Sequence, residues 1–301
     1  MHTRLKLIVV LLALITASTG VAQTSQADQD KEELRMAALE ALMHAPSERA
    51  LPIVIKVLNG DNSDDLKESA LFILSQIDHP DATAKLLEFA RSGDGELQLE
   101  AIRMIGISGE NEAMAGLHDI YAAGDEDVRD AVLEAYLIAD DVEGVFNIAM
   151  TTESEHEYEE AVTILAAMDA HEALSKLREA KGPSDALITA YIISDNDAEL
   201  RKLALDGSDI ELQIEAIQAL GIVGANDADT VLVEIYRSTD SEDIKEAALE
   251  GLLIGDYDDS VLALYRASNN VAEKRDLLEV LVVMDSDSVM EVIEEALAGD
   301  Q

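Results

Sequence analysis

Apolar residues recur at fixed positions along this chain and predict a series of amphipathic helices. In each copy a branched apolar residue is followed four places later by a small residue, then by Leu or Ile, and three places further by another apolar residue, as in Leu66, Ala70, Leu71 and Leu74. Residues with this spacing share one face of a helix. The copies have central residues at positions 38, 70, 101, 132, 161, 186, 216, 248 and 277.

The segment between successive copies has room for one further helix. Copies lie about 30 residues apart, and a turn such as Asp78-His79-Pro80 precedes a second amphipathic stretch. Two three-turn helices and two short turns account for this length. The pattern therefore predicts an all-α fold over residues 31–301, a right-handed superhelical solenoid of about nine two-helix repeats.

A second, longer periodicity indicates an internal duplication. Residues 96–121 align with residues 211–236 without gaps, and 14 of the 26 positions are identical. The offset of 115–116 residues continues to Met168 and Met284. We therefore expect a first repeat at 31–60, followed by two related four-repeat blocks at 61–181 and 182–301.

The repeated helices resemble a known family. Asp125-Glu126-Asp127-Val128-Arg129 and Leu212–Gly221 are similar to HEAT repeats, and most of all to the short HEAT-like repeats of phycobilin lyases and many bacterial scaffolds. The resemblance covers about residues 31–299. It implies that the helix carrying Val-Arg lines a concave face, that its Asp and Arg form a ladder between neighbours, and that the array binds other proteins. Arginine is present in this chain at positions 35 and 129, and Lys67, Gln98, Gln213 and Lys245 replace it elsewhere.

The first 22 residues have the features of a signal peptide. Arg4 and Lys6 precede the apolar run Leu7–Ile15, and Gly20-Val21-Ala22 forms a small-residue site. The run is shorter than the roughly 20 residues that span a membrane. We expect cleavage after Ala22, a disordered polar linker at 23–30, no membrane insertion after cleavage, and a periplasmic or secreted product.

The charge of the chain narrows the choice of partner. It carries 63 Asp and Glu against 21 Lys and Arg, a formal net charge of −42. Such a surface repels nucleic-acid phosphates and anionic lipids. A basic protein is the expected partner, and weak, non-specific binding of divalent cations remains open. The alternative is that the acidity serves solubility in a salty medium, where screening hides self-repulsion.

Residues with catalytic chemistry are sparse, and the sequence predicts no catalytic, cofactor-binding or metal site. His156-Glu157 and His171-Glu172 are similar to the His-Glu pairs of deoxyhypusine hydroxylase, an iron enzyme on a HEAT scaffold. The two pairs occupy different registers of their repeats, which favours two solvated surface pairs. The alternative function is an accessory enzyme, lyase-like or dependent on a His/Glu-bound metal.

The remaining candidate is a binding surface on the solvent side of the first helices. Acidic residues one or two places before, or two places after, the central residue point away from the apolar stripe. Tyr121 and Tyr236, at equivalent positions, are expected to pack in the core with the hydroxyl at its rim. We therefore interpret the chain as a non-enzymatic scaffold or adaptor that binds a protein through its concave face. The candidate partner-binding residues are Glu68, Glu100, Asp130, Glu134, Glu159, Glu160, Glu215, Glu246 and Glu250.

Overall fold

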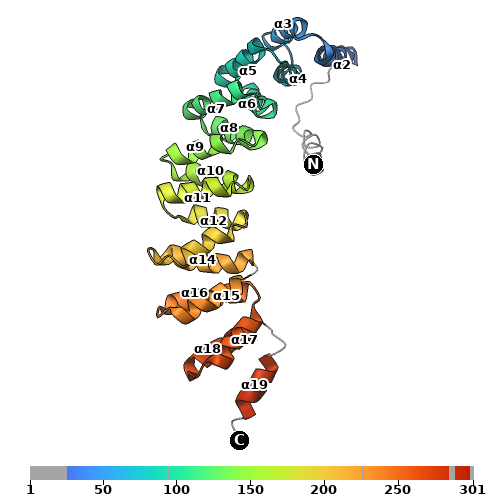
Figure 1. The fold of residues 1–301 in the computed structure, drawn as a ribbon. Coiled ribbons are helices and arrows are strands. Elements are labelled where there is room, and N and C mark those ends of the chain that lie inside the picture. The colour runs from blue at the N-terminus through green and yellow to red at the C-terminus, as the bar shows by residue number, and fades with distance from the viewer. Residues whose placement is uncertain (1–25, 94, 226, 285–288, 299–301) are drawn as a thin grey trace. The chain divides into compact units, whose positions relative to one another are not determined.

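The chain folds as an array of paired helices (Figure 1). The computed structural model describes residues 26–93, 95–225, 227–284 and 289–298. These residues form eighteen α-helices and one short 3-10 helix, η1 (Ala41–His44), and contain no strand. The predicted all-α solenoid is confirmed, while its right-handed sense stays a prediction. The predicted signal peptide at 1–22 lies outside the described residues.

The helices alternate between two sets, named here A and B. The A helices carry the recurring apolar pattern, and each B helix returns the chain to the next A helix. The A helices are α2 (Gln26–Glu40), α4 (Asp64–Ser75), α6 (Glu96–Ser108), α8 (Glu126–Ala139), α10 (Glu155–Ala167), α12 (Asp185–Ile193), α14 (Ile210–Val223), α16 (Glu242–Ile254) and α18 (Val271–Val283). The B helices are α3 (Ser47–Leu58), α5 (Pro80–Ser92), α7 (Asn111–Ala123), α9 (Val142–Thr151), α11 (His171–Lys181), α13 (Asp197–Ala204), α15 (Ala228–Ser238), α17 (Asp258–Ala267) and α19 (Val289–Ala298).

Short polar side chains set where the A helices begin. Asp125 accepts a hydrogen bond from the backbone N–H of Val128 at 3.2 Å, and Asn270 accepts one from Ala272 at 2.9 Å. Such caps satisfy N–H groups that have no partner within the helix. The A helices α10, α12, α14 and α16 are capped in the same way by Ser154, Ser184, Asp209 and Ser241.

Left-handed residues set where several A helices end. Asp140, Asp169, Asp195 and Asp256 have φ between 50° and 58°, a conformation that Asp tolerates better than most residues. The following residue closes the turn, as where the Asp141 N–H donates to the Tyr136 carbonyl at 2.9 Å. This is the hydrogen bond of a Schellman turn, and it leads directly into the B helix.

Contacts divide the chain into two compact units, residues 1–101 and 102–301. In the described part of the first unit, α4 packs against α2, α3 and α5. Its Ala70 and Leu71 are fully buried.

In the second unit, successive A helices lie side by side: α8 packs against α10, α10 against α12, α12 against α14, and α14 against α16 (Figure 1). Small residues allow the closest of these approaches. A Cβ added to Gly221 of α14 would lie 2.2 Å from the Gly251 carbonyl oxygen of α16.

Polar residues near the start of the A helices hold the preceding B helix. The amide of Gln98 donates to the Ala90 carbonyl at 3.0 Å, and that of Gln213 donates to the Ala204 carbonyl at 2.9 Å. Arg129 reaches the Tyr121 carbonyl at 3.4 Å through Nε. At the position that carries arginine in HEAT repeats, glutamine therefore donates a hydrogen bond to a carbonyl oxygen near the end of the preceding B helix. Such carbonyls have no donor within their own helix.

Three sequence predictions differ from the structure in detail. Ala38 is exposed, because α2 packs against α4 on one side and its neighbour Leu39 is the buried residue. Ala186 is half-buried, because α12 begins only at Asp185 and its buried face starts one residue later, at Leu187. The linker predicted over 23–30 overlaps α2, which begins at Gln26, so that its described residues 26–30 are helical and lead into the first repeat.

Among the described residues, no helix combines the length and the apolar character that crossing a membrane requires.

Candidate functional site

The nine predicted acidic residues all lie in A helices, and none of them is buried. Glu68, Glu100 and Glu160 are half-buried, and the other six are exposed. Seven belong to the second unit, where their helices pack side by side. We call this surface the acidic face; its residues are Asp130, Glu134, Glu159, Glu160, Glu215, Glu246 and Glu250.

A groove of about 490 Å³ opens in this face between α8 and α10. Its apolar lining comes from Leu133, Leu137 and Ile164. An apolar surface with a few polar groups around it is the common form of a binding site. The polar residues that line it are Asp130, Glu134, His156, Glu159, Glu160 and Thr163.

A second depression continues the acidic face toward α14. It has a volume of about 290 Å³ and is lined by residues of α10, α12 and α14, including Glu159 and Glu215. Glu159 also lines the groove between α8 and α10, so the two hollows are adjacent. The structure therefore brings Asp130, Glu134, Glu159, Glu160 and Glu215 together on one surface.

Several of these carboxylates have partners, which the sequence pattern did not reveal. Glu134 lies 3.6 Å from the guanidinium of Arg103 on α6. Glu250 accepts a hydrogen bond from the amide of Gln218 on α14 at 2.5 Å. Both contacts join positions two places after the central residue of adjacent A helices. They depend on how the helices are offset, which a single-helix pattern does not report.

Crowding of like charge and partial burial perturb two carboxyl groups of the face. Burial raises the pKa of Glu160, and Asp130, Glu126 and Glu157 raise it further, while His156 at 3.5 Å acts in the opposite direction. Burial likewise raises the pKa of Glu215, with Asp185 as the strongest of its acidic neighbours. In both groups, burial and nearby negative charge outweigh the contacts that stabilise the ionised form.

The first unit has a smaller acidic pair of its own. Burial raises the pKa of Glu68, and the nearby charge of Glu100 is the next largest cause. Both predicted residues are therefore close enough to interact.

Comparison with known proteins places the fold. The model of the HEAT-repeat family matches residues 53–136. Residues 53–136 of this chain therefore consist of HEAT-like repeats. A search of curated protein sequences finds no match.

Solved structures similar to this chain include two natural proteins and a designed one. The complex of CpcE and CpcF of phycocyanin lyase from Nostoc sp. PCC7120 matches at 19% identity and a TM-score of 0.33, over 77% of this chain and 93% of that one. Human deoxyhypusine hydroxylase in complex with glycerol matches at 15% identity and 0.34, over 84% and 98%. A computationally designed self-assembling cyclic homooligomer matches at 14% identity and 0.14, over 90% and 100%.

The two His-Glu pairs of the chain do not converge on one site. His156 approaches Glu160, whereas Glu157 forms an ion pair with Arg129 at 2.6 Å. His171 Nε2 lies 2.9 Å from the Ser194 carbonyl oxygen. In the part of the chain that the structure describes, no group of three or more His, Asp and Glu side chains is arranged to hold a metal ion.

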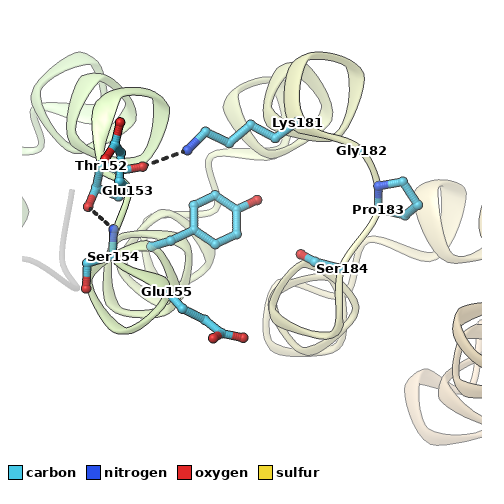
Figure 2. A pocket seen from close by; sticks show the side chains of 9 residues that line it. Thr152, Glu153, Ser154, Glu155, Lys181, Gly182, Pro183 and Ser184 are labelled. Atoms are coloured by element: carbon cyan, nitrogen blue, oxygen red, sulfur yellow. Dashed lines mark hydrogen bonds between the residues drawn. The ribbon is translucent and has the colours of Figure 1, made fainter.

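A small pocket of about 220 Å³ marks the predicted boundary between the two blocks (Figure 2). The Lys181 ammonium donates to the Thr152 carbonyl oxygen at 3.1 Å and lies 5.0 Å from the ring centre of Tyr158. Gly182, Pro183 and Ser184 line the opposite wall. These contacts tie the end of α11 to the turn before α10, and we assign them a structural role.

A buried carboxylate follows the same boundary. Glu199 of α13 is only 4% exposed. It accepts hydrogen bonds from Ser175 at 3.0 Å, Arg178 at 2.7 Å and Lys202 at 2.5 Å. Burial acts to raise its pKa, but these donors and charges outweigh burial and hold the pKa below its ordinary value. This network joins α11 to α13, and its carboxylate is fully engaged.

One exposed feature was missed by the sequence patterns. Large apolar side chains occupy the last turn of most A helices in the second unit, and they are between 39% and 69% exposed. Their signal was their regular position: five of the six lie six residues after the central residue of their repeat, and Ile193 lies seven residues after Ala186. We call this set the isoleucine row: Ile107, Ile138, Ile193, Ile222, Ile254 and Val283.

Proposed function

We propose that this protein is a non-enzymatic scaffold that binds a basic protein through the acidic face of its A helices. The observation that supports the proposal is the repetition of exposed acidic positions in the duplicated stretch. Asp130 and Glu134 of α8 correspond to Glu246 and Glu250 of α16, at an offset of 116 residues. All four are exposed, so core packing does not explain their recurrence.

Charge favours a basic partner. With a net charge of −42, the chain presents a negative field that attracts cationic surfaces and steers their approach. The raised pKa values of Glu160 and Glu215 add to this argument, since a cation placed over either carboxylate would stabilise its ionised form.

We place this function outside the cytoplasm, in the periplasm or the medium. The support is the sequence of residues 1–22, in which a short basic segment precedes an apolar run and a small-residue site. Intact-mass analysis of the exported protein should give a chain beginning at Gln23. A mature chain that retains Leu7–Ile15 would contradict the proposal.

Partner capture with matched charge reversals tests the binding face. Asp130, Glu159, Glu215 and Glu246 are exposed. Changing these four to Lys should abolish capture of a stoichiometric partner from the extract of the source cells. The fold should survive, because surface substitutions usually change stability by within about 0.5 kcal/mol each.

A control variant separates the face from bulk charge. It carries four Glu→Lys changes on the exposed side of B helices and alters the net charge equally. Equal loss of the partner in both variants, or loss in neither, would overturn the acidic-face proposal. The control positions are Glu112, Glu143, Glu179 and Glu234.

A further inference from the structure

The isoleucine row lies on the same side of the A helices as the acidic face. In α8 the residues Asp130, Glu134 and Ile138 are spaced i, i+4, i+8, and in α16 Glu246, Glu250 and Ile254 repeat that spacing. Residues at these intervals follow one line along a helix. Each of these helices therefore presents acidic groups in its second and third turns and an isoleucine in its last turn.

The isoleucine row extends across neighbouring helices of the second unit. The helices α12, α14 and α16 pack side by side, and they expose Ile193, Ile222 and Ile254 by 49%, 55% and 50%. The isoleucines thus form an apolar line across the array, next to the acidic one. Aligned exposed apolar groups of this kind are typical of interaction surfaces rather than of a monomer's ordinary surface.

The duplication retains this line, as it retains the acidic residues of α8 in α16. Ile107 corresponds to Ile222 at an offset of 115 residues, and Ile138 corresponds to Ile254 at an offset of 116. The groove between α8 and α10 adds a further apolar contact, because Leu133, Leu137 and Ile164 line it below its acidic residues.

We infer that the isoleucine row and the acidic face together bind an amphipathic, basic α-helix of the partner, which lies across the A helices. This inference rests on the proposed function and specifies the partner. The charge of the chain argues against the other occupants: a second copy would bring two acidic faces together, and an anionic lipid surface would be repelled.

The spacing of the row favours a helix over an extended segment. Packed helices lie about 8–10 Å apart, which sets the distance between successive isoleucines. Seven residues of an α-helix rise about 10.5 Å, so its residues i and i+7 meet successive isoleucines with the same face. An extended chain covers that distance in about three residues, and side chains three apart point to opposite sides.

The test uses a synthetic probe and the purified chain. The probe is a peptide of about three heptads with leucine at the first and fourth positions and lysine at flanking positions. A peptide of the same composition, scrambled so that it has no apolar stripe, serves as the reference. Fluorescence anisotropy should show that the chain binds the amphipathic peptide at least about tenfold more tightly than the scrambled one.

Two matched variants locate the contact. Ile222→Gln with Ile254→Gln should lower affinity for the amphipathic peptide by about tenfold and leave the scrambled peptide unaffected. Ile53→Gln with Leu205→Gln should change neither affinity, although Ile53 and Leu205 are comparably exposed at 48% and 65%. Circular dichroism should give the same helix content for both variants as for the original chain.

Three outcomes would overturn the inference. The first is equal affinity for the two peptides, which means that charge alone is recognised. The second is unchanged binding in the variant of Ile222 and Ile254. The third is self-association of the original chain that this variant abolishes, which identifies a second copy as the occupant.

The proposed function fails separately. If this isoleucine variant still captures the cellular partner while the four-residue charge reversal does not, the acidic face is a binding site and the helical, apolar mode of recognition is wrong.

Discussion

The duplicated stretches of the second unit, residues 102–160 and 217–276, use the same framework with different polar contacts. In both, a glycine of one A helix lies against the backbone of the next: Gly106 against Ala135, and Gly221 against Gly251. In both, a tyrosine at the end of a B helix is buried, Tyr121 at 7% and Tyr236 at 5% exposure. Both stretches therefore share the close approach of the A-helix backbones and the buried tyrosine, and we call these shared features the framework.

The hydrogen bonds and ion pairs of polar side chains differ between the two stretches. Glu157 in the first copy forms an ion pair with Arg129 at 2.6 Å and accepts a hydrogen bond from Thr152 at 2.7 Å. Its counterpart Glu273 accepts hydrogen bonds from Tyr236 at 3.1 Å and from Ser268, and it forms no ion pair with any residue that the structure describes. The Tyr121 hydroxyl is buried without a hydrogen bond of ordinary geometry. The two copies thus stabilise equivalent positions in chemically different ways.

The largest effect should come from the glycines. A Cβ at Gly221 would lie 2.2 Å from the Gly251 carbonyl oxygen, and one at Gly106 would lie 2.6 Å from the Ala135 carbonyl oxygen. Because the obstacle is backbone in both cases, the helices must separate. Thermal and urea unfolding should show that Gly221→Ala and Gly106→Ala each destabilise the chain by about 1–3 kcal/mol, with the larger loss at Gly221.

Two controls sharpen this prediction. Gly251→Ala makes the second copy resemble the first, and its Cβ would meet nothing closer than 3.0 Å, so a smaller loss is expected. Gly207→Ala, with no atom within 4 Å, should be almost neutral. If Gly207→Ala cost as much as Gly221→Ala, close approach would not be the reason for glycine in these helices.

Loss of the carboxylate should lower the free energy of unfolding moderately at Glu157 and much less at Glu273. Glu157→Gln leaves the half-buried Arg129 without its anionic partner, and we expect a loss of about 1–2 kcal/mol. Glu273→Gln keeps an oxygen that can accept from Tyr236, so the change should stay within about 0.5 kcal/mol. Urea unfolding of both variants measures the difference. Equal losses would mean that the two copies are held together alike.

The sequence predicts this framework well because its signals are local. Residues four and five apart fix one buried face, and Ala70, Ala101, Val132, Ala161 and Ala216 are all fully buried. The failures occur where the local pattern meets a boundary. Ala38 lies in the first described helix, and Ala186 follows the Gly182-Pro183 turn that delays α12.

The binding surface was predictable only in part, for a physical reason. Helical spacing shows that Asp130 and Glu246 point outward, as the structure confirms. It does not show that Arg103 reaches Glu134 or that Gln218 reaches Glu250, since these contacts depend on the offset between helices. The isoleucine row was visible in the sequence, but an outward isoleucine and a core isoleucine look alike until the helix is placed.

A smaller effect on stability, which depends on pH, should distinguish Glu160 from its counterpart Asp276. Glu160 has a raised pKa in the folded chain, whereas its counterpart Asp276 lies 3.0 Å from Arg275. A folded-state pKa above the unfolded value means that ionisation opposes folding above that pKa, and that this penalty disappears as the pH falls through it. Glu160→Gln should therefore stabilise the chain at pH 7 by a few tenths of a kcal/mol, an effect of the size expected for a partly exposed charge.

The comparison with Asp276→Asn provides the control. That change removes the attraction to Arg275 and should give no stabilisation at pH 7. Melting temperatures recorded from pH 7 down to below the ordinary Glu value of 4.5 should show the advantage of Glu160→Gln vanishing. A constant advantage across this range would exclude ionisation of Glu160 as its cause.

The smallest effect concerns the turns that end the A helices. After the first A helix of each duplicated stretch, the left-handed residue is a glycine: Gly109 with φ 62° and Gly224 with φ 64°. After the second A helix it is an aspartate: Asp140 with φ 58° and Asp256 with φ 57°. Glycine adopts this conformation without the steric penalty of a Cβ, although it has more freedom to lose on folding. Aspartate also places negative charge at the negative end of the helix dipole. Asp140→Gly and Asp256→Gly should therefore each raise stability by about 0.5 kcal/mol in urea unfolding.

Asp141→Gly is the control, because it makes the same charge change one residue later. Asp141 caps α9 by accepting a hydrogen bond from the Gly144 N–H at 3.0 Å, so this variant should have slightly lower stability. If all three variants gained equally, relief of negative charge rather than of left-handed strain would explain the gain.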